Sequence, residues 1–190
     1  MKEIPARQSP IAPFPLTGPF QYFHLPVFPY RRGMEFTLPS PSTLFLIQFA
    51  ATAMMTGIIW FVQVVHYPLF TKIPEEGFVR YEQAHTVRTG WVVAPLMLLE
   101  LGTAVAPFLS WGAGGGSPLS SSPLYLAALG CLILIWISTF LLQVPLHGIL
   151  EKRHDPRAML LLSSTNWIRT ILWSVRLGLL GSLAMRAGLA

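Results

Sequence analysis

The chain has 190 residues, of which 53% are hydrophobic and 11% are charged, and its net charge is +5. Soluble domains carry about 25% charged residues, so this composition, with a mean hydropathy of +0.54, excludes an ordinary soluble domain. Basic residues that flank membrane helices account for the net charge, and lysines interleaved with base-stacking aromatics are absent, which argues against a nucleic-acid partner. We therefore predict an integral membrane protein in contact with the lipid bilayer.

Residues 1–42 are rich in proline and aromatic residues. Because proline fixes one backbone angle and lacks an N–H donor, this composition disfavours both helix and central strand and predicts an extended, polyproline-like arm. Two interpretations of the arm are open. Translation begins at Met34, or the arm is genuine and lies across another subunit of a larger membrane complex.

Residues 43–190 hold four apolar stretches, at about 43–67, 91–109, 124–146 and 164–185. A bilayer span needs about 20 mostly apolar residues, so the predicted fold is an all-α bundle of four transmembrane helices. The single cysteine, Cys131, lies in the third stretch. Within one subunit it permits neither a disulfide framework nor a thiol-based metal site.

The first span carries a continuous polar stripe. Its members recur at steps of three or four residues, which places them on one helix face: Gln48, Thr52, Thr56, Trp60, Gln63 and His66. Lipid offers these groups no hydrogen bonds, so the stripe is expected to face the bundle interior, where its glutamines and threonines join helices. Pro68 is expected to end this helix.

The link that follows, residues 68–90, contains a second helical pattern. Phe78, Tyr81 and His85 recur at i, i+3 and i+7, which predicts a short interfacial helix between the first and second spans.

Glu100 lies near the middle of the second span, where an ionisable side chain costs at least ~2.5 kcal/mol to insert. Its expected partner is Arg176 in the fourth span. Glu100 follows Trp91 by nine residues and Arg176 follows Trp167 by nine, so the two lie at equal depth in helices of the same direction. The sequence predicts an ion pair, and leaves open whether it only joins the second and fourth helices or also serves catalysis.

The orientation in the membrane follows from the positive charges of the links. The link between the second and third spans is uncharged, whereas the other two links are basic. The positive-inside rule therefore predicts an inner-membrane protein with the hairpin tips 68–90 and 147–163 in the cytoplasm and the termini outside. The residues that carry this prediction are Lys72, Arg80, Arg88, Lys152, Arg153 and Arg157.

This topology brings five polar residues to one membrane face: His66, His85, His147, Asn166 and Arg169. Imidazoles at helix ends transfer protons near neutral pH or bind a haem iron or a transition metal. The three histidines are therefore the candidate catalytic groups and metal ligands, although their spacing from one another fits no short metal-binding motif. Asn166 and Arg169 are expected to orient an oxyanion or a carboxylate.

Four stretches carry a resemblance to known proteins: GIIWFVQVVHYPLF, YEQAHTVRTGWVVAPLMLLE, STFLLQVPLHGIL and TNWIRTILWSVR. Residues 43–186 resemble a group of small bacterial four-helix membrane proteins. More loosely, they resemble the membrane domain that includes anthrone oxygenases, and the resemblance implies oxidation of polycyclic phenolic substrates by dioxygen. The order of elements is also similar to that of the four-helix protoporphyrinogen oxidases and their haem-binding relatives, in which a histidine lies within the first span rather than at its end.

Two function classes remain open. The first is a membrane oxidoreductase whose cytoplasmic-side pocket admits a lipophilic aromatic or quinone-like molecule. The second is an accessory subunit of a larger membrane complex, anchored by residues 1–42. The arm favours the second class, and the gathered histidines favour the first. A transporter is disfavoured, because the spans lack broken repeat halves and a chain of carboxylates.

Overall fold

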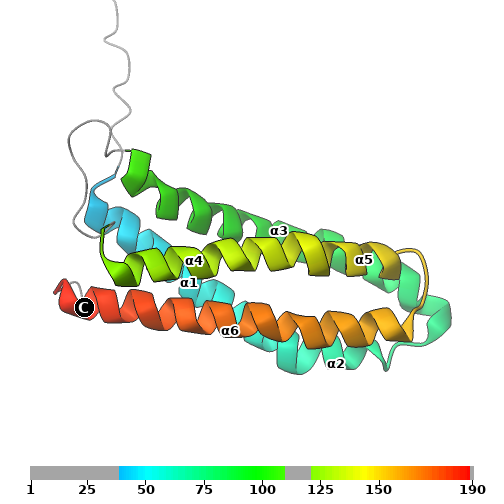
Figure 1. Cartoon of the computed structure of the whole chain (residues 1–190). Helices are drawn as coiled ribbons and strands as arrows, with labels where there is room; N and C mark the ends of the chain where they lie inside the picture. The colour runs from blue at the N-terminus through cyan, green and yellow to red at the C-terminus, as the bar shows by residue number, and fades with distance from the viewer. Residues whose placement is uncertain (1–38, 110–120, 189–190) are drawn as a thin grey trace, which may run out of the picture. The chain divides into compact units, whose positions relative to one another are not determined.

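The computed structural model describes residues 39–109 and 121–188, and every element within them is helical. Four helical segments are long and apolar enough to cross a membrane: Pro41–Phe70, Glu75–Leu109, Pro123–Leu150 and Pro156–Arg186. Figure 1 shows these segments as a four-helix bundle, so the predicted fold class is confirmed. Residues 1–38 lie outside the described part, and with them nearly all of the predicted arm.

The first span consists of α1 (Pro41–Phe61), a π-helical turn η1 (Val62–His66) and α2 (Tyr67–Phe70). The helix therefore continues past Pro68, and the prediction that it ends there is wrong. A proline inside a helix removes a backbone donor and crowds the carbonyl four residues back. The wider π turn directly before Pro68 accommodates that ring.

The third span repeats this arrangement. It consists of α4 (Pro123–Ser138), a second π turn η3 (Thr139–Gln143) and α5 (Val144–Leu150), with Pro145 in the first turn of α5. Single π turns are frequent at functional sites. Here both turns directly precede the short helices that form the hairpin end of the bundle, α2 and α5.

The second span is one helix of 35 residues, α3 (Glu75–Leu109). The short interfacial helix expected around Phe78–His85 is therefore not a separate element but the first part of α3. No proline lies between Glu75 and Ala94. A single glycine in a helix interior, here Gly90, costs only about 1 kcal/mol relative to alanine and does not break the helix.

The fourth span is α6 (Pro156–Arg186), and Asp155 caps its N-terminus. The Oδ1 atom of Asp155 accepts hydrogen bonds from the backbone N–H groups of Arg157 and Ala158, each at 3.1 Å. The hydrogen bond from Ala158 and the side chain of Arg153 lower the pKa of the Asp155 carboxyl. The cap is thus strongest when Asp155 is ionised, and it fixes where α6 leaves the tight turn after α5.

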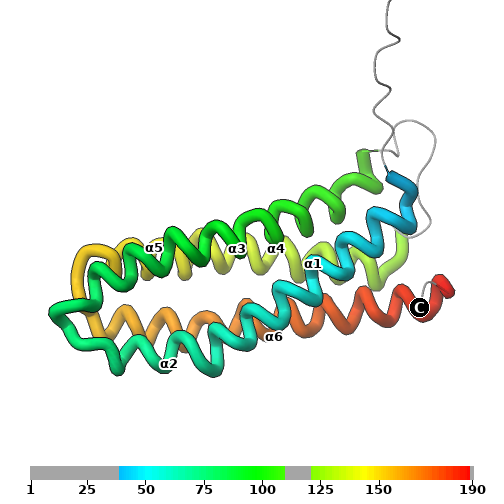
Figure 2. The backbone as a smooth tube through the Cα atoms, turned by 180° about the vertical axis from the view of Figure 1, so that it is seen from behind, coloured from blue at the N-terminus to red at the C-terminus, as the bar shows by residue number. Residues whose placement is uncertain are grey.

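The bundle is organised around α6, which packs against α1 and α4, while α1 packs against α3. Figures 1 and 2 show the same neighbours from opposite sides. Three apolar clusters follow one another along the helices, around Phe45, around Met55 and around Phe78. Buried polar groups lie between these layers, as the stripe in the first span predicts for Gln48, Thr52, Thr56 and Gln63. Trp60, also assigned to the stripe, is instead 43% exposed.

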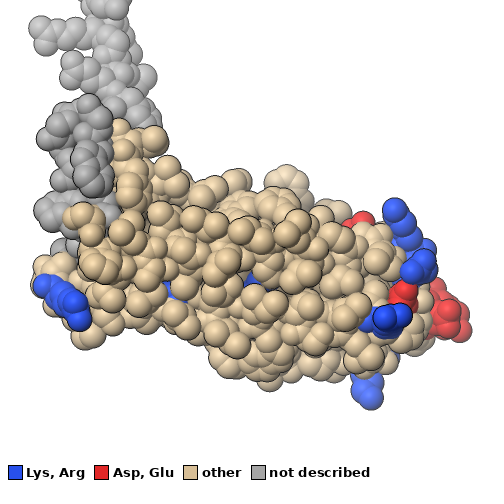
Figure 3. All heavy atoms as spheres, viewed as in Figure 1, with Lys and Arg blue, Asp and Glu red and all other residues tan. Residues whose placement is uncertain are grey.

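The outer surface matches a membrane environment. Large apolar side chains such as Leu98, Leu141 and Leu160 are 60–70% exposed. On the face that Figure 3 shows, most charged side chains lie at the hairpin end of the bundle, and the surface between the two ends is almost entirely uncharged. Exposed apolar side chains of this kind are stable in contact with lipid chains, so the protein is an integral membrane protein with four spanning helices.

Candidate functional site

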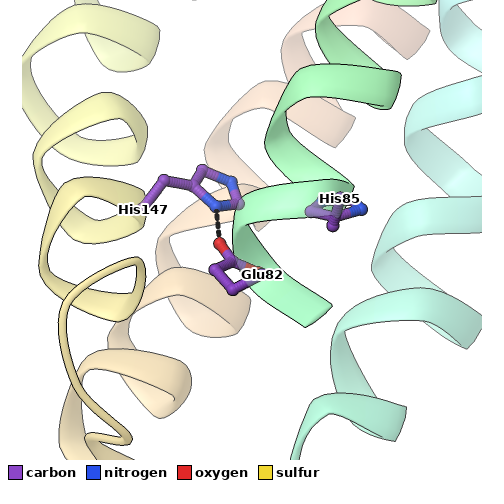
Figure 4. Close-up of side chains that lie close together, drawn as sticks. All are labelled: Glu82, His85 and His147. Atoms are coloured by element: carbon purple, nitrogen blue, oxygen red, sulfur yellow. Dashed lines mark hydrogen bonds and ion pairs between the residues drawn. The ribbon is translucent and has the colours of Figure 1, made fainter. Parts of the chain in front are cut away.

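The hairpin end of the bundle gathers all three predicted histidines. His66 ends η1, His85 lies in the first half of α3, and His147 lies in α5. Each is half-buried, and the ring centroids lie 4.3 Å apart for His66 and His85 and 5.8 Å apart for His85 and His147. Residues from three spans therefore form one cluster. Figure 4 shows the part of it where α3 and α5 meet.

The cluster contains a hydrogen-bonded chain of a carboxylate, an imidazole and a phenol. Glu82 Oε1 lies 2.5 Å from His147 Nδ1, and His147 Nε2 lies 3.1 Å from the Tyr67 hydroxyl. Glu82 is fully buried and Tyr67 is 5% exposed. If Glu82 is ionised, its oxygen can only accept; His147 Nδ1 then donates to Glu82, and Nε2 accepts from Tyr67. Moving one proton along each bond gives a neutral Glu82 and a Tyr67 phenolate, so the chain can relay protons.

His66 and His85 form a second pair beside this chain. His66 Nε2 lies 2.9 Å from His85 Nδ1, which is also 3.1 Å from the Thr89 hydroxyl. The Tyr81 and His85 rings are nearly parallel, with their centroids 6.3 Å apart. The aromatic neighbours hold the orientation of the imidazoles, and the exposed edge of Tyr81 lies at the outer side of the cluster.

Asn166 and Arg169 lie on the α6 side of the same site. Asn166 Nδ2 donates to Gln63 Oε1 at 2.9 Å, and an Arg169 amino group donates to Asn166 Oδ1 at 3.4 Å. The Arg169 guanidinium interacts with the Tyr67 phenol and lies over the Trp173 ring at 5.2 Å. Arg169 thus brings a positive charge next to the Tyr67 phenol.

Glu82 and Tyr67 are the two members of the site that sequence reasoning missed. The sequence pattern grouped Tyr81 with Phe78 and His85 on one face and left Glu82 off that face, whereas in the structure Phe78 and Glu82 are fully buried and Tyr81 is 40% exposed. A signal was present, because Glu82 and His85 stand at i and i+3, the spacing of the Glu-x-x-His ligand pairs of carboxylate metal proteins. No pattern singled out Tyr67.

Glu100 and Arg176 meet in the middle of the bundle, where the equal-depth argument places them. Arg176 Nε lies 3.4 Å from Glu100 Oε1, and both side chains are fully buried. Glu100 also accepts from Thr52 Oγ1 at 2.5 Å and from Trp173 Nε1 at 3.0 Å, and Arg176 donates to the Ala128 carbonyl at 2.5 Å. Both oxygens of the carboxylate are thus occupied, and the network ties together α1, α3, α4 and α6.

The group of side chains that could hold a metal ion differs from the three histidines expected from the sequence. Glu82, His85 and His147 each offer one ligand atom, and these three atoms lie within 4.8 Å of one another. His66, the third histidine of the expected set, instead contacts His85 directly. Ligation of a haem by these histidines stays a prediction.

An apolar groove of about 470 Å³ lies between the third span and α6, and its lining includes Leu134, Leu141, Ile168 and Ile171. Three of these, Leu134, Leu141 and Ile171, are more than half exposed. The groove faces outward and reaches η3, so it is suited to an acyl chain or an apolar ring rather than to chemistry.

Comparison of the chain with protein-family models, with curated proteins and with solved structures finds no match. Its function must therefore be inferred from the geometry of the cluster.

Proposed function

We propose that this integral membrane protein is an oxidoreductase-type enzyme acting on a lipophilic aromatic molecule of the phenol or quinone class. The observation that carries the proposal is the chain Glu82–His147–Tyr67, an acid–base relay placed at the end of an apolar bundle. Structural packing alone does not require a fully buried carboxylate joined to a histidine and a phenol, and burying such groups is costly. Ionisable residues in membrane helices mark functional sites by default.

The residues of the relay would handle the substrate's protons. His147 and Tyr67 share a proton that can move between them, so together they can accept a proton from a phenol or an acidic C–H group and return it. Glu82 stabilises the imidazolium that forms on His147, and Arg169 brings a positive charge next to the Tyr67 phenol. Asn166 fixes the position of Arg169 through its side-chain oxygen.

The oxidant in this proposal is dioxygen, as the resemblance to the anthrone-oxygenase membrane domain implies. An aromatic CH₂ group between two rings would lose two hydrogens and gain one oxygen atom to become a carbonyl. The second oxygen atom would leave as water, so one dioxygen is consumed for each carbonyl formed. A substrate of this kind is soluble in lipid and would reach the bundle through the membrane.

Oxygen uptake with 1,8-dihydroxyanthrone as the probe tests the proposed function. The full chain in lipid nanodiscs is expected to consume dioxygen and form the anthraquinone faster than protein-free nanodiscs, with one dioxygen used per quinone. The protein-free sample corrects for spontaneous oxidation of the probe. A rate equal to that of protein-free nanodiscs would contradict the proposed function.

We also propose that the hairpin end faces the cytoplasm of a cell with an inner membrane. The support is the gathering of basic residues at this end, among them Lys72, Arg80 and Lys152. In a Cys131→Ser background, Lys152→Cys is expected to resist a membrane-impermeant maleimide in intact cells and to react after lysis. Ser121→Cys, at the opposite end, is expected to react in intact cells. The reverse labelling pattern would establish the opposite orientation.

A further inference from the structure

The starting point is a buried carboxylate oxygen. Glu82 is fully buried, and within the described part of the chain its Oε2 atom has no hydrogen-bond partner. Its Oε1 atom contacts only an imidazole nitrogen, and no lysine or arginine of the described chain forms an ion pair with it. A buried charge is normally paired or bound to a metal ion, so this oxygen is available to bind a cation.

The groups nearest to this oxygen are suited to a metal. One nitrogen each of His85 and His147 and one oxygen of Glu82 lie within 4.8 Å of one another. Glu82 and His85 are three residues apart on α3, and His85 lies on the other side of the α3 ribbon from His147 in Figure 4, where its Nδ1 bonds His66 of the first span. Figure 4 shows Glu82 and His147 reaching toward each other from α3 and α5. Two imidazoles and one carboxylate suit a divalent first-row transition metal such as Fe²⁺.

We propose that Glu82, His85 and His147 bind one divalent transition-metal ion per chain. The carboxylate brings one negative charge to the set and the neutral imidazoles bring lone pairs, so a divalent ion resolves the unpaired charge of Glu82. The binding proposal stands apart from the oxidation of aromatic molecules. Only the choice of Fe²⁺ among such ions rests on the proposed function, because this ligand set is that of non-haem iron oxygenases.

Metal binding would change the hydrogen bonds around the site in a defined way. A metal ion on His147 Nδ1 replaces the proton that Nδ1 now shares with Glu82. His147 Nε2 then carries the proton, so it donates to Tyr67 instead of accepting from it. With the ion bound, the Glu82 end of the relay is closed, and protons pass only between His147 Nε2 and Tyr67. His66 Nε2, at 2.9 Å from His85 Nδ1, supports the orientation of the second imidazole. Tyr67 and His66 are thus the outer partners that metal-binding histidines usually have.

Titration with Co²⁺ tests this proposal, because Co²⁺ accepts the same ligands and its visible spectrum reports them. The full chain in detergent, stripped with a chelator, is expected to bind one Co²⁺ and to develop d–d absorption bands. Glu82→Gln, His85→Ala and His147→Ala are each expected to weaken binding by at least about 100-fold, beyond the roughly 10- to 100-fold cost of losing an outer partner.

Two residues of the same hairpin end serve as matched controls. Glu151 accepts a hydrogen bond from Thr86, and the ring of His154 contacts Phe78, so neither belongs to the ligand set. Glu151→Gln and His154→Ala are expected to bind Co²⁺ as the unaltered chain does. Glu82→Gln is nearly isosteric and keeps an oxygen near His147, so it tests the site even where an alanine variant fails to fold.

Two outcomes would overturn the metal site. Either the unaltered chain binds less than one Co²⁺ with no d–d bands, or Glu82→Gln binds as tightly as the unaltered chain, which places the ion elsewhere. Both readouts need no substrate. Co²⁺ binding without dioxygen consumption by the Fe²⁺-loaded chain would support the metal site and contradict the proposed function. Dioxygen consumption without Co²⁺ binding would support the proposed function and contradict the metal site.

Discussion

Replacement of His147 by alanine is expected to lower the rate of oxygen uptake with 1,8-dihydroxyanthrone by roughly 10²- to 10⁴-fold, the range for loss of an acid–base group. His147 is the central member of the relay, since its two nitrogens contact Glu82 and Tyr67. Its removal takes from a buried carboxylate the one hydrogen-bond partner it has among the described residues, and from a phenol its acceptor. The effect is read as kcat in nanodiscs, with the protein-free rate subtracted.

Two variants make this result specific. His154→Ala removes the other histidine of the same tip, whose ring packs on Phe78 and has no contact with the relay, and it is expected to keep the rate. Tyr67→Phe removes one hydrogen bond of the relay and is expected to cost roughly 10- to 100-fold, less than His147→Ala. Equal rates for His147→Ala and His154→Ala, with both proteins folded, would remove the relay from the reaction.

The second large effect is expected for the buried ion pair. Arg176→Ala leaves Glu100 charged and fully buried without its cation, which typically costs about 3–5 kcal/mol in the free energy of unfolding. Glu100→Ala leaves the guanidinium unpaired in the same way. The double variant has no uncompensated charge, so each single variant is expected to destabilise the bundle more than the double does. Denaturant titration in micelles, followed by tryptophan fluorescence, gives the three free energies.

A surface pair provides the comparison. Arg153 donates to Asp155 at 2.9 Å, but its side chain is 67% exposed, so water and salt screen this interaction and Arg153→Ala is expected to change the unfolding free energy little. Additive losses at Glu100 and Arg176 would show that these two residues are not coupled. The contact between them would then contribute nothing to the free energy of unfolding. Apolar packing and the hydrogen bonds from Thr52 and Trp173 to Glu100 would join the helices instead.

Much of the fold could be predicted because apolar composition acts locally. Each span is a stretch of apolar side chains that are stable in lipid or in the bundle core, so hydropathy predicts the number of helices and their approximate positions. The boundaries were less accurate around Pro68 and around residues 75–90. Proline and a change in polarity both suggest a break, yet a π turn accommodates Pro68, and the backbone of α3 continues through a polar stretch that only its environment distinguishes from the span.

The ion pair and the gathering of the histidines were also within reach of sequence reasoning. Both depend on depth along the helices, and depth follows from counting residues, since each adds about 1.5 Å. Glu100 and Arg176 are level by this count, and they are in contact in the structure. His66, His85 and His147 all lie at the same end for the same reason.

The sequence by itself thus determined the membrane environment, the four helices and the end of the bundle that holds the polar site. Only the tertiary structure decided that Glu82, and not Tyr81, faces His147 across 65 positions of the chain. Neighbouring positions on a helix differ by about 100° around its axis, and residues 75–90 carry polar side chains on all sides of the helix, so the sequence does not indicate that rotation. The packing of α3 against its neighbours fixes the rotation, and with it the contact that carries the proposed chemistry.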